Sequence, residues 1–181
     1  MRLKLTLAAL AVVWAPAPGA ATIDFDDLVG TGPVPAGYAG LSWEGWTHYD
    51  LADQPYYEPR SPATRVYAPG PNAIIGVEPF RFEGAYFSGP PENLLRFDLY
   101  FNGNLKHSSE SLSIGASYAF LDSGYRGAVD KVVVSATSPW YFVMDDVVVH
   151  SVPEPGTYAM LLGGLALVIA LTRPVLTRKH R

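Results

Sequence analysis

In the stretch NLLRFDLYF, which ends at Phe101, apolar and polar side chains alternate from Leu95 onward. Successive residues of a β-strand point to opposite faces, so this period of two predicts a strand with one face in a core and the other in a polar environment. The expected apolar face is Leu95, Phe97, Leu99 and Phe101, and the expected polar face is Arg96, Asp98 and Tyr100. A chain with this pattern is built from half-buried strands.

Asn102 and Gly103 follow this strand directly, and Asn-Gly tolerates the positive φ angles of a two-residue hairpin turn. We expect the returning strand at about 109–116. Other strands are predicted at 22–28, 40–46, 72–76, 80–87, 129–137 and 141–150. Turn residues separate these segments, and residues 52–72, which are rich in proline, are expected to form a long surface loop. The pattern predicts an all-β fold, an antiparallel β-sandwich or jelly roll.

Residues 1–21 have the order of a secretory signal peptide. Arg2 and Lys4 precede an apolar stretch, and small residues follow it. Cleavage is expected before Thr22, with cleavage before Ala20 or Ala21 as the next choices. An uncleaved N-terminal anchor is the alternative, but the apolar stretch is short for a hydrocarbon core of about 30 Å.

The other end of the chain carries an uncharged segment, residues 157–172, followed by a basic tail at 173–181. The segment is close to the minimum length of a single transmembrane helix, and the positive-inside rule places the tail in the cytoplasm. Pro153 and Pro155 flank Glu154 and give a stiff, extended stretch before the helix. These features fit a plain membrane anchor, and they also fit a segment that a processing enzyme recognises.

The stretch VPEPGTYAMLLGGLALVIAL with its basic end resembles the PEP-CTERM sorting signal. The resemblance implies that residues 152–181 are processed by exosortase, a membrane protease-transpeptidase of bacteria that make extracellular polysaccharide. It implies export through the secretory translocon of a Gram-negative bacterium and transient anchoring in the inner membrane with a cytoplasmic C-terminus. Delivery to the cell surface or to the exopolysaccharide (biofilm) matrix would follow. The implied recognition motif is Val152, Pro153, Glu154 and Pro155.

The segment between the two signals, residues 22–151, is then an extracytoplasmic domain. From Thr22 to Val152 the chain has sixteen acidic and seven basic side chains, a net charge of −9. This charge disfavours nucleic acid as a partner and favours divalent cations. The chain has no cysteine, so the domain must be stabilised by packing.

Two acidic stretches, IDFDDL and VMDDVVV, begin and end the domain. Because alternate residues of a strand face opposite sides, one acid of each pair should lie among apolar neighbours, where an unpaired carboxylate is costly. If the two strands are close, a Ca²⁺ ion could bind the carboxylates of Asp24, Asp26, Asp27, Asp145 and Asp146. Pairing of these acids with arginine and backbone donors is the alternative.

An aromatic cluster occurs in GYAGLSWEGWTHYD and in the proline-rich loop. Exposed rings beside polar groups can stack on the apolar face of a pyranose, which makes a glycan-binding face one interpretation. Packing in the core is the other, and strand alternation would send Trp43 and Trp46 to opposite faces. The candidate glycan-binding residues are Trp43, Trp46, Tyr49, Tyr56 and Tyr57.

The domain also resembles uncharacterised extracellular β domains with FDDL-type first strands, a Gly-Tyr-x-Gly-Leu-x-Trp stretch and MDDV-type last strands. That resemblance implies a fold and no activity. No nucleophile motif, phosphate loop or spaced histidine set is present, so we do not expect an enzyme. The sequence predicts an exported structural or adhesive matrix protein. The alternatives are a lectin-like carbohydrate-binding module, stabilised by Ca²⁺ or not, and a glycan-processing enzyme.

Overall fold

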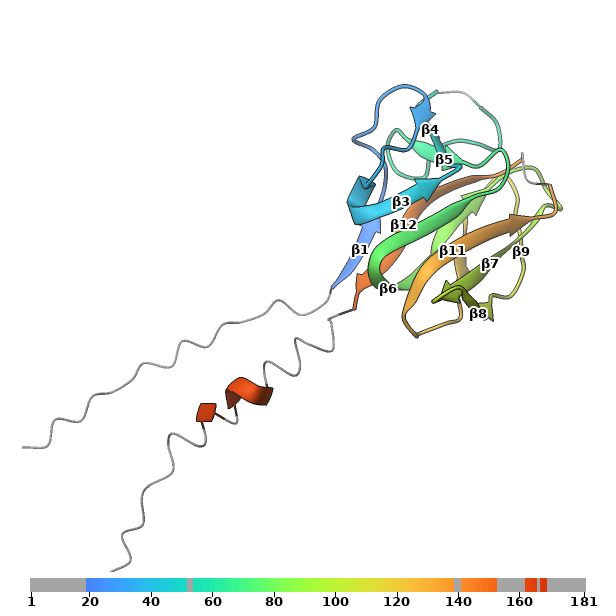
Figure 1. Cartoon of the computed structure of the whole chain (residues 1–181). Helices are drawn as coiled ribbons and strands as arrows, with labels where there is room; N and C mark the ends of the chain where they lie inside the picture. Colours follow the sequence, from blue (N-terminus) through green and yellow to red (C-terminus); the bar gives the residue numbers. More distant parts are fainter. Residues whose placement is uncertain (1–18, 52–53, 139–140, 153–161, 166, 169–181) are drawn as a thin grey trace, which may run out of the picture.

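A computed structural model describes residues 19–51, 54–138, 141–152, 162–165 and 167–168 (Figure 1). Its strands all pair antiparallel, which confirms the prediction of an all-β antiparallel fold. A 3-10 helix, η1 (Tyr38–Gly40), precedes β3. The strands are β1 (Ala20–Ile23), β2 (Gly32–Pro33), β3 (Leu41–Glu44), β4 (Thr47–Tyr49), β5 (Arg65–Tyr67), β6 (Ala73–Ser88), β7 (Leu94–Phe101), β8 (Asn104–Ser108), β9 (Leu112–Ser113), β10 (Ala119–Asp122), β11 (Val129–Ala136) and β12 (Val143–Ser151).

The long strand β6 takes part in both layers of the domain. Its first residues pair with β3 and β11, and β11 continues to β7, β8 and β9. Its last residues pair with β10 and β12, and β12 continues to β1, β5, β4 and β2. Phe82 of β6 and Phe97 of β7 then face each other with ring centroids 4.7 Å apart. The two halves therefore pack face to face, as in a sandwich.

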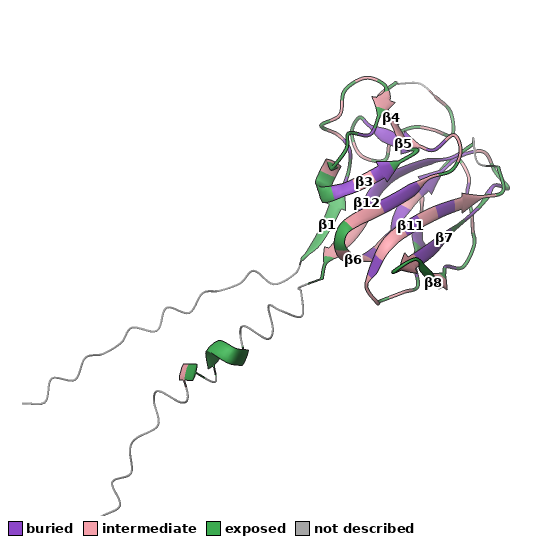
Figure 2. Ribbon diagram, viewed as in Figure 1, coloured by how far each residue is buried: buried purple, intermediate pink, exposed green. Residues whose placement is uncertain are grey.

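Aromatic side chains connect the two layers through the core. Edge-to-face or tilted contacts run from Phe25 through Trp43 and Trp46 to Phe142, and then through Phe87 to Phe97. Such pairs add stability beyond the area that they bury. Figure 2 shows the buried residues gathered on β3, β6, β7, β11 and β12, with β1 and β8 largely exposed.

The predicted hairpin is confirmed, but its second strand begins earlier than expected. Asn102 and Gly103 have φ angles of 51° and 72°, so β8 starts at Asn104, directly after the turn. Leu95, Phe97 and Leu99 are fully buried, in agreement with the predicted apolar face.

The expectation that Trp43 and Trp46 would face opposite sides is wrong. The strand predicted at 40–46 is interrupted at Gly45, whose φ angle is +74°. The chain leaves β3 in one layer there and enters β4 in the other. Both indoles consequently point into the core, where they are 5% and 1% exposed.

The predicted alternation also fails within β12. Asp146 has a φ angle of 46°, and the pairing of β12 with β6 shifts register between Asp145 and Val148. This bulge leaves both Asp145 and Asp146 buried, at 0% and 6% exposure. The first strand is shorter than predicted because Phe25 has a φ angle of 62° and a turn follows it.

The first and last strands of the domain lie side by side, with Ala20 opposite His150 and Ile23 opposite Val147. β1 begins two residues before the expected cleavage at Thr22. Residues 162–165 and 167–168 are helical, but no helix within the described part of the chain is long and apolar enough to cross a membrane. The rest of the predicted signal peptide, the Pro153–Glu154–Pro155 motif and the basic tail lie outside the described residues.

Candidate functional site

An open groove of about 280 Å³ lies at the end of the layer that contains β4, β5 and β12. Four of its lining residues are tyrosines, which come from both strands and loops. The complete lining is Thr31, Tyr49, Leu51, Gln54, Tyr57, Tyr67, Tyr141, Phe142 and Val143.

The register of β4 and β5 places Tyr49 and Tyr67 on the same side of the sheet. Tyr49 is opposite Arg65, and Tyr67 is opposite Thr47, so alternation directs all four side chains to one face. The core residue Val66 points the other way. The rings of Tyr49 and Tyr67 meet edge to face at 5.4 Å. The groove therefore lies on the outer face of this layer.

The proline-rich loop covers this outer face and supplies one wall of the groove. Ser88 Oγ donates to the Tyr56 carbonyl at 3.0 Å, and the Tyr49 hydroxyl lies 3.5 Å from the carbonyl of Tyr57. Within the loop, the Tyr57 amide donates to the Gln54 carbonyl at 2.9 Å. These contacts hold Gln54 and Tyr57 against the sheet, so the wall is preorganised.

Carboxylates of the two acidic stretches hold the root of this loop. Asp145 Oδ2 accepts hydrogen bonds from the backbone amides of Arg60 at 2.8 Å and Ser61 at 3.0 Å. Asp26 Oδ1 accepts from the amides of Ala63 at 3.0 Å and Thr64 at 3.1 Å. Four backbone amides of this loop are thus satisfied by two acids that lie far away in the sequence.

The side chain of Arg60 completes the anchor. Its guanidinium forms an ion pair with Asp146 and stacks 3.7 Å from the ring centroid of Tyr86. The remaining acids are engaged locally: Asp24 accepts from the Asp26 amide at 3.3 Å, and Asp27 accepts from the Tyr38 hydroxyl at 2.5 Å. Each of the five acids proposed as calcium ligands is therefore paired with an arginine, hydroxyl or backbone donor, as the alternative interpretation describes.

Among the described residues, no group of three or more His, Cys, Asp or Glu side chains could hold a metal ion. Because both carboxylate oxygens of Asp145 already accept hydrogen bonds, a Ca²⁺ ion at Asp145 would have to displace these donors. We expect the melting temperature of the protein to be the same in EGTA and in excess Ca²⁺, measured by differential scanning fluorimetry. A rise in melting temperature that saturates with Ca²⁺ would contradict this expectation.

Asp145 is the acid most affected by its surroundings. Burial raises the pKa of Asp145 from 3.8 to about 6, and the hydrogen bonds from Ser61 and Arg60 oppose this rise. Between these two values the folded protein binds a proton that the unfolded chain does not. Asp145 therefore makes its largest contribution to stability below about pH 4, and this contribution is lost as the pH rises through about 6.

This pH dependence of stability can be tested with the isosteric Asp145→Asn variant, whose side chain does not titrate. The free energy of unfolding of the wild type, relative to that of the variant, should fall by about 2 kcal/mol between pH 4 and pH 7. Urea unfolding at a series of pH values measures the difference. A difference that stays constant across this range would show that the Asp145 carboxyl is not perturbed by burial.

Arg65 lies beneath the groove and is fully buried. Its guanidinium is 4.1 Å from the ring centroid of Tyr49, and Nη2 donates to the Leu51 carbonyl at 2.5 Å. Its Nε and Nη1 atoms have no hydrogen-bond partner within the described structure. The cation thus supports Tyr49 and Leu51 from behind and does not reach the groove surface.

Of the five candidate glycan-binding residues, Tyr49 and Tyr57 line the groove. Trp43 and Trp46 belong to the core, which was the alternative interpretation, and Tyr56 is 44% exposed but does not line the groove. Tyr67, Tyr141, Gln54 and Thr31 were not predicted. The THY and RVY segments alternate with a period of two, which was the available signal for Tyr67.

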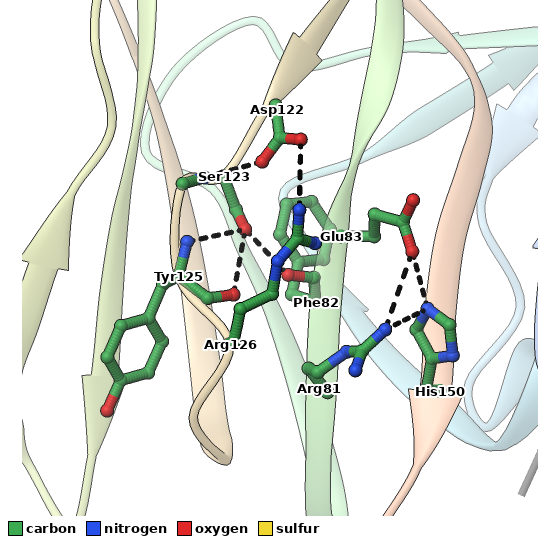
Figure 3. Close-up of polar contacts among 9 residues, drawn as sticks. Arg81, Phe82, Glu83, Asp122, Ser123, Tyr125, Arg126 and His150 are labelled. Carbon is green, nitrogen blue, oxygen red and sulfur yellow. Dashed lines mark hydrogen bonds and ion pairs between the residues drawn. The ribbon is translucent and has the colours of Figure 1, made fainter.

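Another polar cluster lies on β6, β12 and the β10–β11 connection (Figure 3). His150 Nε2 is 2.5 Å from a carboxylate oxygen of Glu83 and 2.9 Å from Arg81. Ser123 Oγ donates to the Phe82 carbonyl at 2.7 Å, and Asp122 forms an ion pair with Arg126. The Ser123 hydroxyl is committed to backbone contacts, so this cluster ties strands together.

No protein-family model and no curated protein match the chain. Among solved structures, a mutant of CBM29-2, a family 29 carbohydrate-binding module, is similar, with 15% identity and a TM-score of 0.45 over 74% of this chain and 92% of that chain. The CBM22-1 xylan-binding domain of Paenibacillus barcinonensis Xyn10C has 12% identity and a TM-score of 0.44 over 76% and 97%. The CBM22-1–CBM22-2 tandem domain of the same protein has 12% identity and a TM-score of 0.46 over 80% and 49%. Identities and TM-scores this low assign the chain to no family.

Proposed function

We propose that this domain is a non-catalytic carbohydrate-binding module of an exported matrix or surface protein, and that it adheres to polysaccharide through the tyrosine groove. The observation that carries this proposal is the convergence of Tyr49, Tyr57, Tyr67 and Tyr141 on one open groove. These residues come from β4, β5, the proline-rich loop and the segment just before β12.

The chemistry of the lining suits a sugar. The C–H face of a pyranose packs on an aromatic ring, and its hydroxyls need hydrogen-bond donors and acceptors. The phenol hydroxyls, the Gln54 amide and the Thr31 hydroxyl offer both. At about 280 Å³, the groove is near the lower limit of the about 300–1,000 Å³ typical of ligand pockets, which suits about one or two sugar rings of a longer chain.

The groove lining is better suited to binding a saccharide than to hydrolysing it. Most glycoside hydrolases use a pair of carboxyl groups flanking the bond that breaks. Within the described part of the lining, no residue is Asp or Glu. The groove therefore supplies stacking and hydrogen bonding without an acid–base pair.

The experiment is a binding screen of the full chain, purified in a mild detergent, against immobilised polysaccharides that differ in sugar, linkage and charge. Isothermal titration calorimetry with oligosaccharides of the same composition then gives Kd. We expect at least one polysaccharide to bind and a short oligosaccharide of it to compete. Failure of every polysaccharide in the screen would overturn the proposed function.

Export and sorting form the second part of the proposal, and they rest on the resemblance of residues 152–181 to the PEP-CTERM signal. β12 ends at Ser151, so Pro153, Glu154 and Pro155 directly follow the domain. Alanine replacement of Glu154 should leave the protein in the membrane fraction of its host, whereas the Glu110→Ala variant should be processed normally. Equal release of both variants would argue against exosortase as the partner.

A further inference from the structure

The groove presents uncharged groups to its ligand. Its described lining consists of phenols, one amide, one alcohol and apolar side chains. Burial raises the pKa values of Tyr49 and Tyr57 above the ordinary 10.0 of a phenol, so both hydroxyls stay neutral under physiological conditions. The lining residues that the structure describes therefore offer no formal charge to a ligand near neutral pH.

Arg65, the cation beneath the groove, is not available to a ligand. Its side chain is 0% exposed, its guanidinium lies over the Tyr49 ring at 4.1 Å from the centroid, and Nη2 donates to the Leu51 carbonyl. A carboxylate in the groove would have to displace Tyr49 to form an ion pair with it. In the observed arrangement Arg65 positions the ring and makes no direct contact with the groove.

The charge of the whole domain opposes an anionic ligand. Between Thr22 and Val152 the net charge is −9. Asp50 lies next to two lining residues in the sequence, and its carboxylate accepts a hydrogen bond from the Gly30 amide at 2.7 Å. A polyanionic chain would meet this field, and no described lining residue is a cation that could offset it.

We propose that the ligand is an uncharged polysaccharide and that the groove discriminates against uronic-acid polymers. This inference rests on the proposed function. Recognition then depends on stacking and on neutral hydrogen bonds. Binding of the uncharged ligand is insensitive to ionic strength, because no formal charge takes part in it.

Matched ligand pairs test this inference. Short β-1,4-, β-1,3- and α-1,4-glucan chains are compared with the same chains oxidised at C6 to the carboxylate, using the full chain in calorimetry. Titrations run between about 0.01 M and about 1 M NaCl, over which the Debye length falls from about 30 Å to about 3 Å. We expect an uncharged chain to bind with constant Kd, and its oxidised partner to bind about tenfold more weakly at low salt.

A pair of variants tests whether a cation placed in the groove improves binding of the oxidised chain. Gln54 lines the groove, whereas Glu58 is exposed and does not line it. Gln54→Lys and Glu58→Gln raise the net charge by the same amount, so they separate a local cation from the overall field. Gln54→Lys should tighten binding of the oxidised chain about tenfold and make it salt-dependent, and Glu58→Gln should change it less than twofold.

The outcomes separate the two levels of the proposal. Tight, salt-sensitive binding of an oxidised chain by the wild type would overturn the preference for uncharged ligands while leaving a saccharide-binding module in place. An equal gain from Gln54→Lys and Glu58→Gln would show that the overall field, and not the neutral lining, sets the preference. Absence of binding by all chains, together with a negative polysaccharide screen, would overturn the proposed function itself.

Discussion

Gly45→Ala is expected to lower the free energy of unfolding by about 3 kcal/mol or more. Gly45 has a φ angle of +74°, which an L side chain rarely adopts, and an added Cβ would lie 2.1 Å from the Pro71 carbonyl oxygen. That atom is backbone and cannot rotate away. Because Gly45 carries the chain from β3 to β4, relief of the overlap would also disturb Trp43 and Trp46 in the core. Urea denaturation measures the loss directly.

Gly37→Ala is the matched control. Gly37 has a φ angle of +75°, but an added Cβ would meet no atom within 4 Å. Only the conformational cost of a positive φ should appear, about 1 kcal/mol. If both variants lost the same stability, the close approach of Gly45 to Pro71 would be of no consequence, and the crossing between the layers would not depend on it.

Tyr141→Ala is expected to weaken saccharide binding about five- to thirtyfold, a loss of about 1–2 kcal/mol of stacking and hydrogen bonding. Tyr141 lines the groove and is 56% exposed, so its ring is free to contact a ligand and contributes little to the core. Calorimetry with the best-binding oligosaccharide gives the change in Kd, and the melting temperature should hardly change.

Tyr56→Ala provides the comparison for this variant. Tyr56 is 44% exposed and neighbours Tyr57, but it does not line the groove. The Kd of Tyr56→Ala should lie within about twofold of the wild-type value, below 0.5 kcal/mol. Equal losses from both tyrosines would move the binding surface from the groove to the exposed loop, and no loss from either would remove Tyr141 from the site.

The elements predicted correctly are those whose signal is local. The alternation in β7, the Asn102–Gly103 turn and the apolar runs of β11 and β12 depend on neighbours within a few residues. The errors occur where one residue changes the direction of a strand. Gly45 and Asp146 both take positive φ angles, and each places a side chain on the face opposite to the one that alternation predicts.

The groove depends on contacts that no local pattern contains. Asp145 binds Arg60 and Ser61 from 84–85 residues away in the chain, and only the folded sheet brings them together. The acidic pairs were correctly identified as needing compensation, but the donors that satisfy them lie in the proline-rich loop. The same loop supplies Gln54 and Tyr57 to the groove lining, so the site could not be predicted before the loop was placed.

The pairing of β1 with β12 determines how the domain is displayed. Val143, at the start of β12, lines the groove, and the strand runs nine residues, about 27 Å, to its end at Ser151, where Ala20 lies nearby (Figure 1). Ala20 and Ser151, the two ends of the domain, therefore lie at the pole opposite the groove. A protein held by either end would point its tyrosines outward, within reach of passing polymer, and trimming at both ends would leave that orientation unchanged.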